Sequence, residues 1–428
     1  MISQYRKATF CVVFVCALLW QALSFAQVLI VKAERMLNVE AGKVISPAML
    51  VIEGEYIKAV NPESLPGGAK TLDLGDVTLL PGLIDMHTHL IFQLSANSQL
   101  KTVTESTADW TINGMVNARK TLLAGFTTVR DVAARDFIAV ALAKASAAGT
   151  IAAPRIIPAG HALSITGGHG DAGGFAPGIL EGGPEQGIAD GVDEVVKAVR
   201  YQIKHGAKVI KIAATAGVLS FEGPVGAQQY SEPEIRAIVE EAARHGIKVA
   251  AHAHGTEGIK AAVRAGVASI EHGSMLDDEA IALMKQNGTY LVPTTYLAEA
   301  IDLKVLPPIM RAKAERVIPL AQRSLEKAIR AGVKIAFGTD AAVFPHGLNG
   351  KEFGALVDRG MKPIEAIRAA TINATDLLGM ADRGVLKAGL LADIVAVQEN
   401  PLEDIRVLEN VQFVMKGGRV YKRSESKK

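Results

Sequence analysis

Histidines end several of the short apolar runs in this chain. The run "LLPGLIDMHTHL" ends with His87 and His89, and the runs "KVAAHAHG" and "ASIEHG" contain His252 and His272 near their ends. Asp340 ends a further run, "KIAFGTDA". Neutral imidazoles combined with a carboxylate are typical ligands of zinc and related divalent ions. A single histidine on an apolar strand is more often a hydrogen-bonded core residue, but four of them with an aspartate favour a metal site.

Lys211 is the unusual member of this group, because it lies inside the apolar run "VIKIAA". A charged amine is costly to bury between Ile210 and Ile212. Either a neighbouring acid compensates its charge, or burial keeps the amine neutral so that it can react with carbon dioxide. The resulting carbamate is an anionic oxygen ligand able to bridge two metals. The residues alone leave both interpretations open.

The segments that carry these residues alternate between apolar β-type runs and amphipathic helical patterns. One helical pattern, "SEPEIRAIVEEAARHG", starts with Ser231 and has Glu234 three residues later, which is typical of a capping box. Eight strand–helix units over about 300 residues predict a (β/α)8 TIM-like barrel, which places its chemistry at the carboxyl ends of the strands. A doubly wound open sheet is the structural alternative.

Both ends of the chain have short β-type runs separated by turn-forming residues. Residues 27–83 and 384–428 are therefore expected to form one small composite β-sandwich domain. Residues 84–383 are expected to form the barrel, which gives an α/β protein overall.

Residues 1–26 predict a secretory signal peptide. Arg6 and Lys7 precede a long apolar run, and small residues stand before a cleavage site after Ala26. An uncleaved membrane anchor is the alternative. Both cysteines of the chain, Cys11 and Cys16, lie in this segment, so the exported protein has no disulfides. The 46 basic residues include Arg6 and Lys7, so their removal leaves 44, equal to the 44 acidic residues. This balance gives no indication of nucleic-acid binding, and a membrane is expected only during export.

Five motifs together resemble the metal-dependent amidohydrolase superfamily: "PGLIDMHTHL", "VIKIAA", "AHAHG", "SIEHG" and "FGTDA". Within it, "HALSITGGHGD" and "QYSEPEIRAIVEEA" are similar to the imidazolonepropionase-related group that includes Xaa-Pro dipeptidases and metallocarboxypeptidases. The resemblance implies two divalent metal ions, with zinc, manganese and cobalt all suited to the ligands, and zinc expected. It also implies a homo-oligomer. The implied metal ligands are His87, His89, Asp340, His252, His272 and a carboxylated, bridging Lys211.

In "HAHG" the resemblance favours the first histidine, His252, as the ligand, and His254 would lie beside it; the alternative is that His254 is the ligand instead. The resemblance also implies that Asp340 moves the proton during catalysis. His161 and Tyr230 are expected to polarise the substrate carbonyl. His169, on the glycine-rich loop "TGGHGD", is a weaker candidate for substrate binding.

The implied reaction is cleavage of an amide bond beside a C-terminal residue by a metal-bridging hydroxide, in an exported Xaa-Pro-type dipeptidase or carboxypeptidase. An amidase for N-acyl amino acids or for an aromatic amide such as an ochratoxin-like mycotoxin fits equally well. Both substrate types have a free carboxylate. A single-metal cyclic amidohydrolase or deaminase is weaker, because those enzymes lack the lysine. A non-catalytic binding protein is weaker still, because every expected position is filled.

Overall fold

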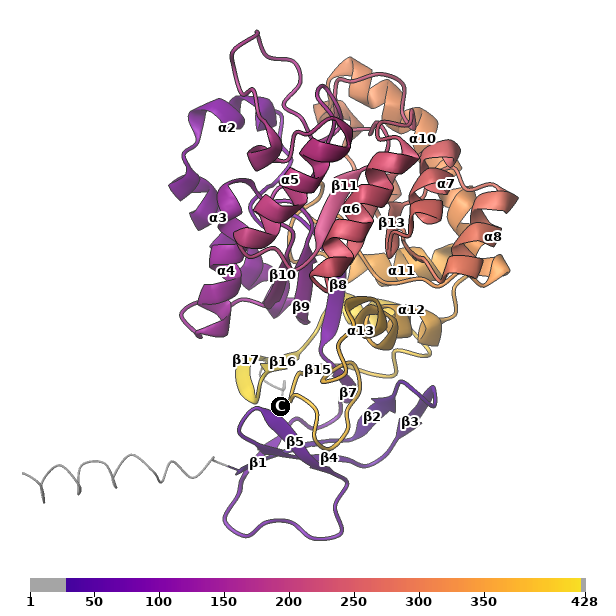
Figure 1. The fold of residues 1–428 in the computed structure, drawn as a ribbon. Coiled ribbons are helices and arrows are strands. Elements are labelled where there is room, and N and C mark those ends of the chain that lie inside the picture. The colour runs from indigo at the N-terminus through magenta and orange to yellow at the C-terminus, as the bar shows by residue number, and fades with distance from the viewer. Residues whose placement is uncertain (1–27, 425–428) are drawn as a thin grey trace, which may run out of the picture.

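The computed structural model describes residues 28–424 (Figure 1). The expected signal segment and both cysteines lie outside these residues, so their interpretation stays a prediction. Within residues 28–424, no helix combines the length and apolar character needed to cross a bilayer.

Parallel strands form the centre of the molecule. In one group β9 lies between β8 and β10, and in a second group β11, β12, β13 and β14 follow one another in order. All of these pairs are parallel. The strands are β8 (Leu83–Thr88), β9 (Phe126–Asp131), β10 (Arg155–Pro158), β11 (Ile210–Ala213), β12 (Val249–Ala253), β13 (Ser269–His272) and β14 (Tyr290–Val292).

Two further contacts close the strands into a ring. Leu163, just beyond β10, accepts a hydrogen bond from the Ala213 N–H and donates one to the Lys211 carbonyl, at 2.8 and 2.7 Å. The segment 335–341 takes the eighth position, because it forms parallel bridges to β14 at one end and to β8 at the other. The α/β class and the parallel ring agree with the sequence expectation.

Helices cover the outside of the ring, as Figure 1 shows. Outward-facing Ile210 and Ile212 share one core cluster with Val195 and Ile235 of the covering helices. The helices are α2 (Ser98–Thr104), α3 (Thr107–Leu123), α4 (Ile138–Ala147), α5 (Gly191–Lys204), α6 (Glu232–Arg244), α7 (Thr256–Ala265), α8 (Asp278–Asn287), α9 (Leu297–Ala300), α10 (Pro308–Ala331), α11 (Lys351–Asp358), α12 (Pro363–Ala369) and α13 (Ile372–Leu378). Short 3₁₀ turns are η1 (Arg135–Phe137), η2 (Pro184–Gln186), η3 (Leu303–Val305) and η4 (Ile405–Glu409).

The predicted start of helix α6 is confirmed. The Ser231 backbone N–H donates to Glu234 Oε2 at 2.8 Å, and the Ser231 hydroxyl lies 2.6 Å from the same oxygen. The helix begins at the next residue, Glu232.

Two sheets lie below the ring in Figure 1, at the end where β8 begins. Strand order is β5-β4-β1-β6 in the first sheet and β17-β16-β15-β7-β2-β3 in the second, so the second joins strands from both ends of the chain. Val31 and Leu50 of one sheet share a core cluster with Leu79 and Ile394 of the other. The strands are β1 (Val28–Ala33), β2 (Arg35–Asn38), β3 (Lys43–Ile45), β4 (Ala48–Glu53), β5 (Tyr56–Val60), β6 (Lys70–Asp73), β7 (Thr78–Pro81), β15 (Ile394–Val397), β16 (Phe413–Lys416) and β17 (Arg419–Arg423).

The passage from β7 into the ring depends on a glycine. A Cβ at Gly82 would lie 2.1 Å from the Thr127 hydroxyl oxygen, so only glycine fits between these strands. Strand β8 therefore enters the ring directly from the lower sheets. Its carboxyl end, with the first histidines, lies at the opposite side.

Candidate metal centre

The first histidine pair meets the predicted aspartate. His87 lies near the end of strand β8 and His89 just after it, and their Nε2 atoms lie 3.5 and 3.3 Å from Oδ1 of Asp340. One ligand atom each from His87, His272 and Asp340 lies within 4.8 Å of the others. The structure thus brings together residues that are some 250 positions apart in the chain, as the spacing of the motifs predicts.

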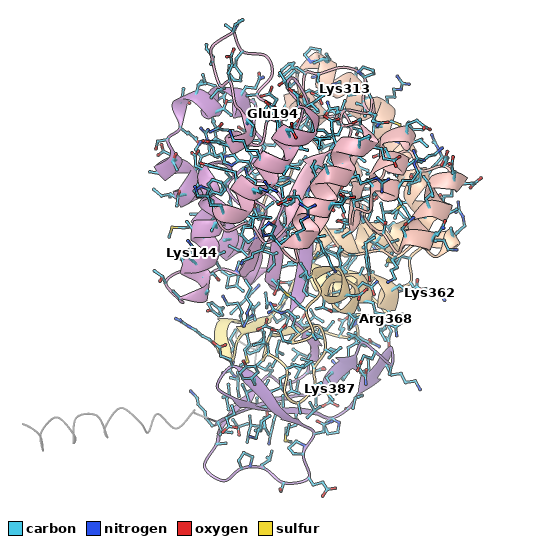
Figure 2. All side chains as sticks on the ribbon, viewed as in Figure 1. Lys144, Glu194, Lys313, Lys362, Arg368 and Lys387 are labelled. Carbon is cyan, nitrogen blue, oxygen red and sulfur yellow. The ribbon has the colours of Figure 1, made fainter. Side chains whose placement is uncertain are left out.

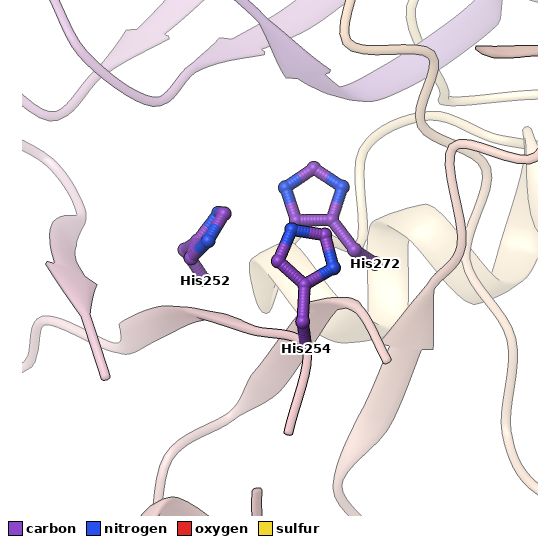
Figure 3. A group of neighbouring side chains, drawn as sticks. All are labelled: His252, His254 and His272. Carbon is purple, nitrogen blue, oxygen red and sulfur yellow. The ribbon is translucent and has the colours of Figure 1, made fainter. Parts of the chain in front are cut away.

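A second group contains three histidines. Figure 3 shows the rings of His252, His254 and His272 gathered around one space, and their ligand nitrogens lie within 4.8 Å of one another. The His252 Nε2 is buried and has no hydrogen-bond partner among the described residues. Both histidines of the "HAHG" motif therefore reach the site, and the preference for His252 over His254 stays a prediction.

Each of four rings is fixed through its Nδ1 atom, which leaves Nε2 for a ligand. Such partners set the orientation and tautomer of metal-binding histidines. The contacts are His87 to Glu271 at 2.8 Å, His89 to the Ala133 carbonyl at 3.3 Å, His254 to Ser274 at 2.7 Å and His272 to Thr294 at 2.8 Å.

A buried ion pair supports His87 from behind. Arg130 Nη2 lies 2.7 Å from Glu271 Oε1, and the Arg130 guanidinium also donates to Ser269 Oγ at 3.2 Å. Burial raises the pKa of Glu271, but Arg130 and His87 outweigh it and hold this pKa at about 2. The sequence analysis missed this pair. The signal was present, since "FTTVRDVA" and "SIEHG" each place a charged residue inside an apolar strand.

Lys211 lies on β11 with 5 % of its surface exposed. Burial lowers the pKa of its amine to about 8, although Glu271 and Asp340 favour the charged form. Among the described residues, no carboxylate oxygen lies within 4.0 Å of its Nζ atom, so a direct salt bridge does not account for its burial. An amine that loses its proton this readily is suited to carboxylation.

The protonation of the rings suits metal binding. Burial lowers the pKa of His87 to about 4 and that of His254 to about 3, and it lowers those of His252 and His272 well below the usual value. Burial acts in the same direction on His89, but its bond to Asp340 outweighs burial and raises the pKa. Burial thus keeps the imidazoles of His87, His252, His254 and His272 neutral, and together with one carboxylate and the unpartnered His252 nitrogen they fit divalent ions with nitrogen and oxygen ligands.

Three residues at this end of the ring have left-handed backbone conformations. The φ angles are 72° at His272, 51° at Thr294 and 58° at Asp340. Non-glycine residues avoid this region unless the surrounding structure enforces it, and such strain concentrates at functional sites. These positions turn the strand ends so that their side chains reach the common space.

A cavity of about 570 Å³ opens above the histidines. Its walls are mostly apolar and include Phe92, Trp110, Leu297, Val317 and Leu325. This size and character suit a small organic ligand held by a few polar groups.

His169 lines the cavity and is held rigidly. Its Nδ1 lies 2.8 Å from the Ser220 hydroxyl, which donates to Glu222 Oε1 at 2.5 Å. The ring stacks on His252 with centroids 4.1 Å apart, and it also lies against Gly217, where a Cβ would come within 2.1 Å of a ring atom.

The loop that carries Ser220 and Glu222 is anchored to α10. Lys313, labelled near the top of Figure 2, donates from Nζ to the backbone carbonyls of both residues, at 2.9 and 2.5 Å. The loop that holds His169 in place is therefore itself tied to helix α10.

His161 also lines the cavity, but both of its ring nitrogens are occupied. Its Nε2 accepts a hydrogen bond from the Asp136 backbone N–H at 3.1 Å, and its Nδ1 lies 3.3 Å from Gln202 Oε1. In this arrangement the ring holds the loop after β9 and presents no free N–H to a substrate carbonyl.

Tyr230 is not at the site, contrary to the sequence expectation. It is completely buried, it is not among the residues that line the cavity, and its hydroxyl donates to the Ala189 carbonyl at 3.1 Å. Burial raises the pKa of this hydroxyl. The residue before a capping serine here faces the core between β11 and the covering helices, so it cannot polarise a carbonyl in the cavity.

Comparison with known proteins agrees with this geometry. The model of the amidohydrolase family matches residues 78–421. Ochratoxinase from Aspergillus niger is 40 % identical over 373 residues, which cover 80 % of this chain and 75 % of that protein.

Solved structures are also similar. A Xaa-Pro dipeptidase with methionine bound in its active site has a TM-score of 0.88 and 40 % identity, and covers 92 % of this chain and 100 % of its own. A prolidase complexed with N-methylphosphonate-L-proline has a TM-score of 0.85 and 35 % identity, and the match covers 93 % of this chain and 100 % of the prolidase chain. The A. niger ochratoxinase structure has a TM-score of 0.82 and 36 % identity, and the match covers 93 % of this chain and 96 % of the ochratoxinase chain. By its sequence, its parallel ring and its histidine-rich centre, this chain belongs to the amidohydrolase family.

Proposed function

We propose that this protein hydrolyses the amide bond of a small substrate with a free carboxylate, as a Xaa-Pro-type dipeptidase or carboxypeptidase. Family membership makes it a hydrolase of carbon–nitrogen bonds. The observation that carries the finer proposal is the buried Lys211 between two groups of histidines. It has no carboxylate partner among the described residues, and once carboxylated it would be suited to serve as a ligand shared by two metals.

Two divalent ions, zinc foremost, would be held by this centre. His87, His89 and Asp340 would hold one ion, His252 and His272 the other, and Lys211, once carboxylated, would bridge them. When bound, such ions lower the pKa of water and polarise a carbonyl oxygen.

Asp340 is suited to move the proton. Its Oδ1 faces the Nε2 atoms of His87 and His89, while Oδ2 has no hydrogen-bond partner within the described part of the chain. We expect Oδ2 to accept the proton of the attacking water and to deliver it to the leaving nitrogen, as a general base and then a general acid. His169 faces the same space and would contact the substrate.

The substrate class is supported by the relatives and by the cavity. Two of the similar structures hold ligands of this kind: the Xaa-Pro dipeptidase holds methionine and the prolidase holds N-methylphosphonate-L-proline. Ochratoxinase supports a second candidate, an amidase for N-acyl amino acids or aromatic amides. The apolar cavity walls accommodate either an apolar side chain or an aryl group.

Export and assembly are further parts of the proposal. Residues 1–26 support secretion or a periplasmic location after cleavage near Ala26. We also expect a homo-oligomer, and light scattering of the purified protein measures its mass.

The decisive test is a substrate screen. The zinc-reconstituted protein is assayed against a library of dipeptides and N-acyl amino acids, with release of the free amino acid as the readout. Turnover confined to peptides with C-terminal proline supports the dipeptidase, and preference for N-acyl or aryl amides supports the amidase. Absence of turnover on every carboxylate-terminated amide would refute the substrate class.

A further inference from the structure

We propose that Arg135 binds the carboxylate of the substrate at the wall of the metal-centre cavity. This inference rests on the proposed amide hydrolysis and names the residue that selects carboxylate-bearing substrates.

Arg135 is set apart by charge. The described residues that line the cavity include three with ordinarily charged side chains: Arg135, Lys211 and Asp340. Lys211 and Asp340 belong to the metal centre, which leaves Arg135 as the cation available to a ligand. A guanidinium stays charged and presents a planar fork of N–H donors that matches a carboxylate.

Contacts hold the guanidinium in place without using all of its donors. Nη1 donates to the Thr102 carbonyl at 3.2 Å, and Cζ lies 5.8 Å from the centre of the Trp110 ring. Nε lies 3.4 Å from Asp136 Oδ2. Within the described residues, Nη2 has no hydrogen-bond partner, and 35 % of the side chain is exposed. The free N–H groups can therefore bind an anion.

The backbone that carries Arg135 is strained and braced. Asp136 and Phe137 both have φ angles of 54°. His161 Nε2 accepts the Asp136 backbone N–H, and Asp136 Oδ2 accepts the Thr107 hydroxyl at 2.7 Å. A strained conformation persists only when its surroundings enforce it, and it is concentrated at ligand-binding sites. His161 is thus a positioning residue for the Arg135 loop.

The cavity supplies the rest of the binding surface. Phe92 and Trp110 are stacked with ring centroids 6.2 Å apart and line the same cavity as Arg135. A substrate held by its carboxylate at Arg135 can lay its apolar part on these rings while its amide faces the histidines. Peptides and N-acyl amino acids have this arrangement of groups.

The test compares an acid with its amide. Kinetics are measured for zinc-reconstituted wild type, Arg135→Ala and Arg135→Lys on N-acetyl-L-proline and on its carboxamide. Loss of a charge-assisted contact predicts a KM about 10- to 100-fold higher for the acid in Arg135→Ala, with kcat little changed. The lysine variant should recover part of this loss, and the carboxamide KM should not change. Arg119→Ala, an exposed position on α3, is the matched control and should behave as wild type.

Product binding separates this inference from the proposed reaction. L-Proline binding is measured by calorimetry for wild type, Arg135→Ala and Arg135→Lys, each first checked for a native melting curve. Wild type that hydrolyses neither compound, yet binds L-proline through Arg135, would refute the reaction and support the anchor. Equal KM values for the acid in wild type and both variants would refute the anchor, as would equal wild-type KM values for the acid and the carboxamide.

Discussion

Lys211 is the residue on which the number of metals depends. We expect Lys211→Ala to lose the bridging ligand, so that bound zinc falls below two ions per chain and turnover is lost. Zinc content by mass spectrometry and amide hydrolysis measure this, and added bicarbonate should assist reconstitution of the wild type only. Lys248→Ala is the control, because Lys248 is a lysine outside the cavity whose Nζ donates to the backbone carbonyls of Asp376 and Leu377. Full activity in Lys211→Ala would contradict the bridging role.

At this scale, residue type and spacing predicted much of the centre. The convergence of His87, His89, His272 and Asp340 follows from their positions at the ends of parallel strands. Tyr230 was misplaced because its neighbours in the sequence do not show whether the residue before helix α6 faces the cavity or the core. Arg135 was not singled out because it lies in the short turn η1, where no periodicity fixes the direction of a side chain.

Among the elements, the segment after β14 is held by one buried acid. Glu352 on α11 accepts the backbone N–H of Thr295 at 2.8 Å and that of Tyr296 at 2.7 Å. The neighbouring Thr294 fixes the His272 ring. The alternation of strands and helices predicted these elements, but the left-handed turns at His272, Thr294 and Asp340 depend on such tertiary contacts and have no local signal.

Removal of the Glu352 carboxyl should affect both stability and metal binding. Glu352→Ala leaves two buried N–H groups without acceptors, at about 1–3 kcal/mol each. Through Thr294, we expect zinc affinity to fall about 10- to 100-fold, as for other residues that orient a metal ligand. Urea unfolding and a zinc titration measure these effects. Glu352→Gln keeps one acceptor oxygen, so its unfolding free energy and zinc affinity should lie between those of wild type and Glu352→Ala. An alanine variant with wild-type zinc affinity would contradict the link through Thr294.

For the whole molecule, the ring and the lower sheets are joined by specific polar contacts. Arg368, labelled in Figure 2 at the level of α12, donates to the backbone carbonyls of Val39 and Glu40 just after β2. On β16, Lys416 Nζ donates to the Ala153 carbonyl at 2.6 Å and to Ser146 Oγ at 3.0 Å. The β-type runs at both ends of the chain predicted a shared sheet, but not which residues attach it to the ring.

The junction lysine should make stability depend on pH. Burial lowers the pKa of Lys416 from 10.5 to about 8. Between these values the unfolded chain binds more protons than the folded one, so the free energy of unfolding rises with pH across this window and the gain is lost as pH falls through 8.

Lys416→Met lacks this contribution. Between pH 7 and pH 10, urea unfolding should therefore show the free energy of unfolding of the wild type rising by about 1–2 kcal/mol relative to that of the variant. This amount is smaller than the pKa shift alone implies, because solvent partly screens the site. The comparison cancels other titrating groups, and Lys387→Met, on the exposed lower loop, should show no such change. If the difference in unfolding free energy between wild type and Lys416→Met is the same at pH 7 and pH 10, the Lys416 amine has the same pKa in the folded and unfolded chain. That result would contradict the proposed pH dependence.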